Sequence, residues 1–146
     1  MKNLVLIISC MCLVNCSSQE NKSIDFKNTS WGTIYDEDIL GDYLEMYFTD
    51  ENVYYFEGAL GVTELEYKIK NGVFSTRINT DSKFIERSEI SIIDDTLYLN
   101  EIGGNRNVKN IRIKENTIKD LIEGNINESS FREYFDERLL KAIGKK

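Results

Sequence analysis

An alternation of apolar and polar residues constrains the fold of this chain more than any other feature. It extends from Trp31 to about Ile113. In the clearest stretch, Thr63, Leu65, Tyr67 and Ile69 alternate with charged residues at positions 64, 66, 68 and 70. A period of two is typical of β-strands with one buried face and one exposed face. Because the chain has no proline, no strand is interrupted by one.

Turn sequences divide the alternating region into about eight short strands. Asn71-Gly72 lies between two alternating segments, and this pair is a strong hairpin signal because both residues accept positive φ. Further turns are expected at positions 50–52, 58–61, 94–95 and 103–105. The long segment 84–93 has a less regular phase, which fits a β-bulge near Arg87. We therefore expect a mainly β fold, an antiparallel up-and-down meander.

The hydrophobic period changes after the last strand. Residues 117–123 fit a short helix that Gly124 closes. A second, amphipathic helix is predicted over 130–143, with Ser130 and Glu133 matching a capping box. Its apolar stripe consists of Phe131, Phe135, Leu139 and Ala142 or Ile143. We expect this helix to lie against an open end or one face of the sheet.

The N-terminus differs in composition from the rest of the chain. Lys2 precedes an apolar run from Leu4 to Val14 that only Ser9 interrupts. A membrane-spanning helix needs about 20 apolar residues, so this run is too short to cross a bilayer. A basic start, a short apolar stretch and a polar exit are typical of a secretory signal peptide.

The end of this run, Leu13-Val14-Asn15-Cys16, resembles the signal of bacterial lipoproteins, in which a branched apolar residue stands three positions before a cysteine. The resemblance implies cleavage before Cys16 and attachment of a diacylglycerol to its thiol. Two or more acyl chains hold a protein firmly on a membrane. We expect a signal peptide over 1–15, a flexible tether over 16–28 and one domain over 29–146. The protein would then be anchored in the cell envelope, at the outer membrane or the cell surface.

The expected domain also resembles a known group. A strand meander with a C-terminal helix and a single tryptophan, Trp31, opening the first strand is similar to the small lipocalin-like barrels among bacterial lipoproteins. The resemblance implies a barrel whose interior holds a ligand. A β-sandwich or an open curved sheet that carries the helix fits the same strand pattern.

Composition excludes several functions. The net charge is −7, and a negative surface repels nucleic acid phosphates. The chain has no histidine, which excludes a Ser-His-Asp triad and the usual zinc sites. Carboxylates are plentiful, but no pair is marked for glycoside hydrolysis. We expect no enzyme activity, no metal and no cofactor.

Aromatic residues crowd the first strands and are the candidate ligand-binding residues. In a barrel, some of them would face the interior and stack on a sugar or an apolar ligand. The alternative is that they form an ordinary core and cross-strand pairs. The candidates are Trp31, Tyr35, Tyr43, Tyr47, Tyr54, Tyr55 and Tyr67.

A dense acidic stretch supports a second hypothesis. It consists of Asp36, Glu37, Asp38, Asp42 and Glu45. Such a patch attracts a basic partner, so the protein would be an inhibitor or immunity protein that binds a basic envelope-targeting enzyme. The alternative is a solvated loop without a partner. A cavity lined by the aromatic residues favours ligand binding, whereas a continuous acidic face without a deep cavity favours the inhibitor.

Overall fold

The computed structural model describes residues 25–34 and 43–144. The predicted signal peptide, Cys16 and most of the predicted tether lie outside these ranges. None of the helices found in the described ranges is long and apolar enough to cross a membrane.

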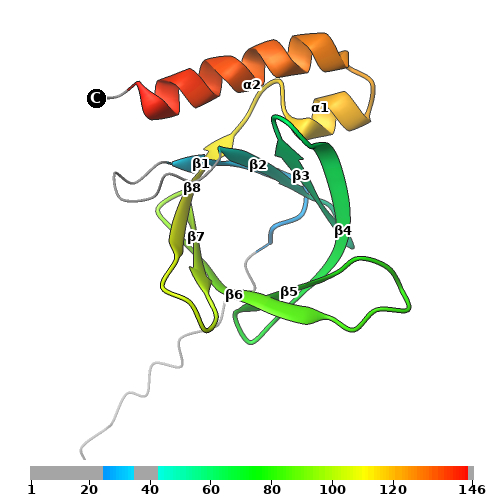
Figure 1. Cartoon of the computed structure of the whole chain (residues 1–146), viewed down its shortest axis with the longest axis vertical. Helices are drawn as coiled ribbons and strands as arrows, with labels where there is room; N and C mark the ends of the chain where they lie inside the picture. Colours follow the sequence, from blue (N-terminus) through cyan, green and yellow to red (C-terminus); the bar gives the residue numbers. More distant parts are fainter. Residues whose placement is uncertain (1–24, 35–42, 145–146) are drawn as a thin grey trace, which may run out of the picture.

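Eight antiparallel strands form a closed barrel in chain order (Figure 1). They are β1 (Thr29–Ile34), β2 (Leu44–Phe48), β3 (Asn52–Glu57), β4 (Gly61–Lys70), β5 (Val73–Arg77), β6 (Ile85–Ile93), β7 (Thr96–Glu101) and β8 (Asn107–Ile113). Each strand pairs with the next, and β8 returns to β1, where Trp31 lies opposite Arg112. The predicted mainly β meander is confirmed, and the sheet is closed rather than open.

The predicted hairpin at Asn71-Gly72 is confirmed. Both residues have positive φ, 54° and 75°. Asp94 and Asp95 adopt the same left-handed region between β6 and β7, with φ of 48° and 60°. Two consecutive positive φ values match the right-handed twist of the flanking strands, so tight turns connect these neighbours.

The interior of the barrel is filled at the end where the chain enters, which we call the proximal end. The ring of Phe26 lies 5.5 Å from that of Phe48, and both side chains are buried in one core with Trp31. The backbone N–H of Thr29 donates to the carbonyl of Phe26. The folded core therefore already includes Phe26, which lies within the range 16–28 predicted for the tether.

Two helices cover the outside of the barrel over β2 and β3 (Figure 1). They are α1 (Ile118–Ile122) and α2 (Glu128–Ile143). Phe131 and Phe135 of α2 contact the ring of Phe56 edge-on, with centroid distances of 4.8 and 4.7 Å. Edge-to-face pairs add to the energy of burial, and they fix the helix on this face of the barrel. The expectation that the C-terminal helix lies on one face of the sheet is confirmed.

The helix ends differ in how well they were predicted. In α1, Thr117 is the N-cap and donates its backbone N–H to the carboxylate of Asp120. The predicted capping box at Ser130 is wrong, because α2 begins earlier. Its N-cap is Asn127, whose Oδ1 accepts from the N–H of Ser130 at 2.9 Å. Asparagine is a strong N-cap residue, so it starts the helix before the serine is reached.

Replacing Phe135 by Ala tests how strongly the helix is held. The side chain is 2 % exposed, so we expect the free energy of unfolding to fall by about 3–5 kcal/mol. Leu140→Ala is the control on the same helix, because Leu140 is 68 % exposed and should change stability little. Urea denaturation followed by circular dichroism measures both; equal losses for the two variants would contradict this packing.

Candidate functional site

The barrel wall divides the predicted aromatic residues into two sets. Trp31, Tyr55 and Tyr67 belong to the interior core. Tyr43, Tyr47 and Tyr54 belong to the outer cluster beneath the helices. Tyr35 lies outside the described residues. Some of the candidates face the interior, as expected, but those described do not line one common site.

The outer aromatic residues have protein partners. Tyr47 stacks on Tyr54, with a centroid distance of 6.1 Å, and its hydroxyl donates to Oδ1 of Asn28. The hydroxyl of Tyr54 donates to Oε1 of Glu64 at 2.9 Å. These rings therefore form a cross-strand pair against which the helices pack, and they are not a free binding surface.

A buried carboxylate lies beside these rings. Glu45 is 1 % exposed and forms a bidentate pair with Arg138 of α2, through Nε at 2.7 Å and Nη2 at 3.1 Å. Its Oε1 also accepts from the hydroxyl of Tyr43 at 3.0 Å. Burial raises the pKa of Glu45, and the guanidinium of Arg138 opposes that shift. The pair joins the C-terminal helix to the barrel wall.

Gly32 makes room for this network. It pairs with Glu45 across β1 and β2, so the two residues share the outer face. A Cβ on Gly32 would lie 2.6 Å from the Tyr43 hydroxyl and 2.9 Å from Cδ1 of Ile113. The glycine after Trp31 therefore lets the tyrosine lie across β1 and reach the carboxylate.

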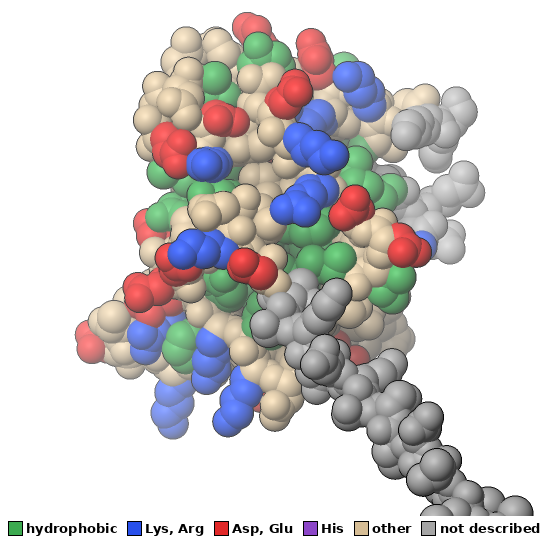
Figure 2. Space-filling view, turned by 180° about the vertical axis from the view of Figure 1, so that it is seen from behind, with side chains coloured by type: hydrophobic (Ala, Val, Ile, Leu, Met, Phe, Trp, Pro, Cys, Tyr) green, Lys and Arg blue, Asp and Glu red, His purple; other side chains and the backbone are tan. Residues whose placement is uncertain are grey.

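The position of Glu45 corrects the predicted acidic patch. Its carboxylate is paired within the fold and is not available to an external partner. The other members, Asp36, Glu37, Asp38 and Asp42, lie outside the described residues. On the face that Figure 2 shows, acidic and basic side chains are interspersed rather than separated.

The end of the barrel opposite Phe26, which we call the distal end, is lined by inward side chains that are less buried than Phe26, Trp31 and Phe48. The turn at 58–60 and the connections 78–84 and 102–106 lie there, where β4, β6 and β8 begin. Three aliphatic side chains face inward near this end yet remain half-buried: Leu44, Leu65 and Val108. Tyr55 shares this inner face and is also half-buried. We call these four residues the distal mouth.

An arginine borders the distal mouth. Phe74 pairs with Ser88 and Ser75 pairs with Glu86, so Arg87 is the extra residue of a β-bulge. The predicted bulge near Arg87 is confirmed. Its Nε donates to Oγ1 of Thr76 at 3.0 Å.

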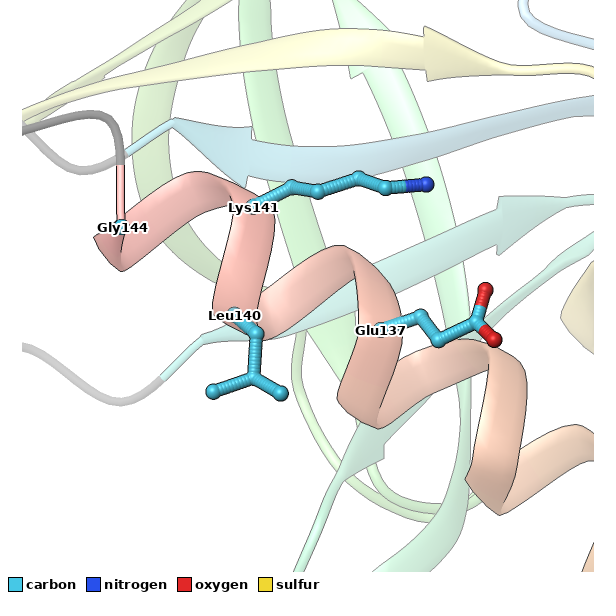
Figure 3. Close-up of a pocket in the computed structure, with 4 residues that line it drawn as sticks. All are labelled: Glu137, Leu140, Lys141 and Gly144. Atoms are coloured by element: carbon cyan, nitrogen blue, oxygen red, sulfur yellow. The ribbon is translucent and has the colours of Figure 1, made fainter.

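Two concavities lie on the outside of the barrel. One is a groove between α2 and the 58–60 turn, with Tyr43, Phe135 and Leu60 among its lining residues. The other is a depression at the last turns of α2, where Leu140 projects away from Glu137 and Lys141 (Figure 3). A single helix lines this depression, so it offers little enclosure to a small ligand.

The sequence analysis missed two arginines of these sites. Arg138 follows Phe131 and Phe135 at helical spacing, which placed it beside the buried stripe and was the available signal. For Arg87, the sequence predicted only the β-bulge in the backbone and not the position of the side chain. Its inward direction depends on pairing with β5, and sequence pattern does not specify a bulge's pairing.

No family model, curated protein or solved structure matches this chain. Among the described residues, no cluster of three or more acidic side chains is arranged to hold a metal ion.

Replacing Arg138 by Met tests the buried pair. The variant leaves the Glu45 carboxylate buried without a cation, so we expect a loss of about 3–5 kcal/mol at pH 7. The folded-state pKa of Glu45 is above its ordinary value of 4.5 and would rise further. Folding therefore favours the protonated form, and the loss relative to the unmodified protein should be small below about pH 4 and grow as the pH rises through the folded-state pKa of Glu45.

Two other variants complete this test. Glu45→Gln combined with Arg138→Met removes the buried charge and should recover part of the stability at pH 7. Glu128→Gln removes an exposed pair with Arg132 on the same helix and should cost about 1 kcal/mol or less. Urea titrations between pH 4 and pH 8 measure all three; a loss for Arg138→Met that does not change with pH would contradict the buried-charge explanation.

Proposed function

We propose that the protein is an exported, lipid-anchored binding protein of the cell envelope that holds one small apolar ligand in the distal half of its barrel. The observation that supports this proposal most is the distal mouth. Its aliphatic side chains face inward, as core residues do, but remain half-buried.

Two of the largest fully buried side chains of the barrel interior, Trp31 and Phe48, lie in the proximal half, and none of the four residues of the distal mouth is fully buried. An eight-stranded barrel is wide enough either to be filled by side chains or to hold one small ligand. Phe26, Trp31 and Phe48 fill the proximal half. A ligand that covers Leu44, Leu65 and Val108 removes apolar surface from water, which is worth about 25 cal/mol per Å².

An apolar ligand fits these residues better than a sugar. Sugar sites combine aromatic faces with several polar groups, and the outer tyrosines already have protein partners. Inside the barrel, Trp31 is fully buried and the hydroxyl of Tyr67 donates to the carbonyl of Thr49. Aliphatic surface and one tyrosine remain at the distal mouth.

The expected anchor is compatible with this position of the ligand. A lipid on Cys16 would connect to the barrel through Phe26, at the proximal end. Nine residues lie between these two positions and span at most about 33 Å. The distal mouth would then lie at the end opposite to the attachment, open to a ligand.

Metabolic labelling with a clickable palmitate analogue tests the anchor. We expect the full chain to be labelled and recovered with membranes, and Cys16→Ser to lose both properties. Cys10→Ser is the matched control, because it removes a cysteine from the apolar run and leaves Cys16 in place. Label that persists in the Cys16→Ser variant would contradict the assignment.

Binding of the neutral fluorescent probe N-phenyl-1-naphthylamine tests the mouth. The probe's fluorescence should rise on binding, and Val108→Trp should suppress the rise because the larger side chain fills the distal half. Ile111→Trp is the control on the same strand, since Ile111 is 51 % exposed on the outer face. Circular dichroism checks that both variants fold; an unchanged signal in Val108→Trp would place the probe elsewhere.

A further inference from the structure

Arg87 carries a positive charge at the distal mouth and has no acidic partner among the described residues. The ion pairs found among residues 25–34 and 43–144 do not include it. The one hydrogen bond of its side chain to a described residue uses Nε, so both terminal nitrogens remain available. A guanidinium with two free nitrogens is suited to bidentate binding of a carboxylate.

The β-bulge turns this side chain toward the interior. Without an extra residue, the alternation from Ser88 would direct Arg87 to the outer face. In the folded chain, Arg87 instead reaches Thr76, which pairs with Tyr67 on the inner face and is 1 % exposed. The buried threonine therefore fixes the stem of the arginine at the distal mouth.

Tyr55 lies on the inner face of another part of the barrel wall. Its strand, β3, is not a neighbour of β6 in the sheet, so its side chain and the inward side chain of Arg87 share the interior across the barrel. Burial raises the pKa of the Tyr55 hydroxyl, and the positive charge of Arg87 acts on it in the opposite direction. The hydroxyl therefore stays protonated at neutral pH, and it has no hydrogen-bond partner within the described part of the chain.

Glu101 is the inward acidic residue that lies nearest to Arg87 in the strand register, and among the described residues it does not neutralise the charge of Arg87. Glu101 pairs with Ser88 across β6 and β7, next to the bulge. Its side chain lies over Gly104, in the space that a Cβ on Gly104 would occupy. The carboxylate is thus turned toward the 102–106 connection, and it forms no ion pair with Arg87 among the described residues.

We propose that Arg87 and Tyr55 bind the carboxylate of a single-chain amphiphile whose alkyl chain lies on Leu44, Leu65 and Val108. This assignment rests on the proposed function, because it names the ligand class of the same site. The guanidinium supplies charge and two donors, and the tyrosine supplies a third donor. A short fatty acid has this combination of a carboxylate and an unbranched chain.

Displacement of N-phenyl-1-naphthylamine by three ligands tests the head group. Decanoate has the carboxylate and the chain, 1-decanol has the chain alone, and acetate has the carboxylate alone. We expect decanoate to bind about ten- to a hundredfold more tightly than 1-decanol, and acetate not to compete.

Variants then assign the preference to the two residues. Arg87→Met should reduce the affinity for decanoate about tenfold or more and leave that for 1-decanol unchanged. Tyr55→Phe should reduce decanoate binding by a smaller factor, and it decides the question if Arg87→Met does not fold. Arg106→Met is the matched control, because it removes a positive charge in the connection at the same end of the barrel and should change neither ligand.

The outcomes separate the two proposals. If decanoate and 1-decanol bind equally and neither Arg87→Met nor Tyr55→Phe changes their ratio, the carboxylate assignment is wrong and the apolar site stands. If the probe and all three ligands fail to bind the folded protein, the proposed function itself fails.

Discussion

The hydrogen-bonded pairing of β1 with β8 closes the sheet, and this closure gives every strand an inner and an outer face. Consecutive residues of a strand therefore lie in different environments, one in the barrel interior and the next on its outer surface. Tyr54 and Phe56 lie outside, under or beside the helices, whereas Tyr55 lies between them in sequence and faces the interior. A closed barrel also has no free strand edge, so the molecule needs no other protection against edge pairing. The separation of the outer surface, where the helices pack, from the interior, where we propose the ligand site, follows from this one pairing.

The strands and turns were predictable because they depend on local sequence. The alternation along β4 and the Asn71-Gly72 turn each have a direct physical cause within a few residues. The burial of the outer face was not predictable in this way. Tyr43 and Glu45 alternate with Met46 as exposed residues would, but a helix that follows about 90 positions later covers them. Closure itself depends on pairing between the first and last strands, which no local pattern specifies.

The two arginines that the sequence analysis missed differ in how their charge is balanced. Arg138 meets a buried carboxylate with two hydrogen bonds, and together with the tyrosine hydroxyl this satisfies a group that would otherwise cost several kcal/mol to bury. Arg87 meets a neutral threonine and no carboxylate among the described residues. The first arrangement is complete within the chain. The second leaves donors unused beside apolar side chains, which is the arrangement expected where a ligand supplies the missing group.

The β-bulge at Arg87 connects the backbone to this proposed site. A bulge interrupts the ladder between β5 and β6, and such interruptions recur where a strand must redirect a side chain near a binding site. A regular β6 would keep its ladder hydrogen bonds and direct the arginine into water. The irregular strand instead holds the charge at the rim of an apolar interior, where the lower dielectric strengthens its attraction for an anion. In the proposed function, this local departure from ideal pairing serves ligand binding rather than the stability of the barrel.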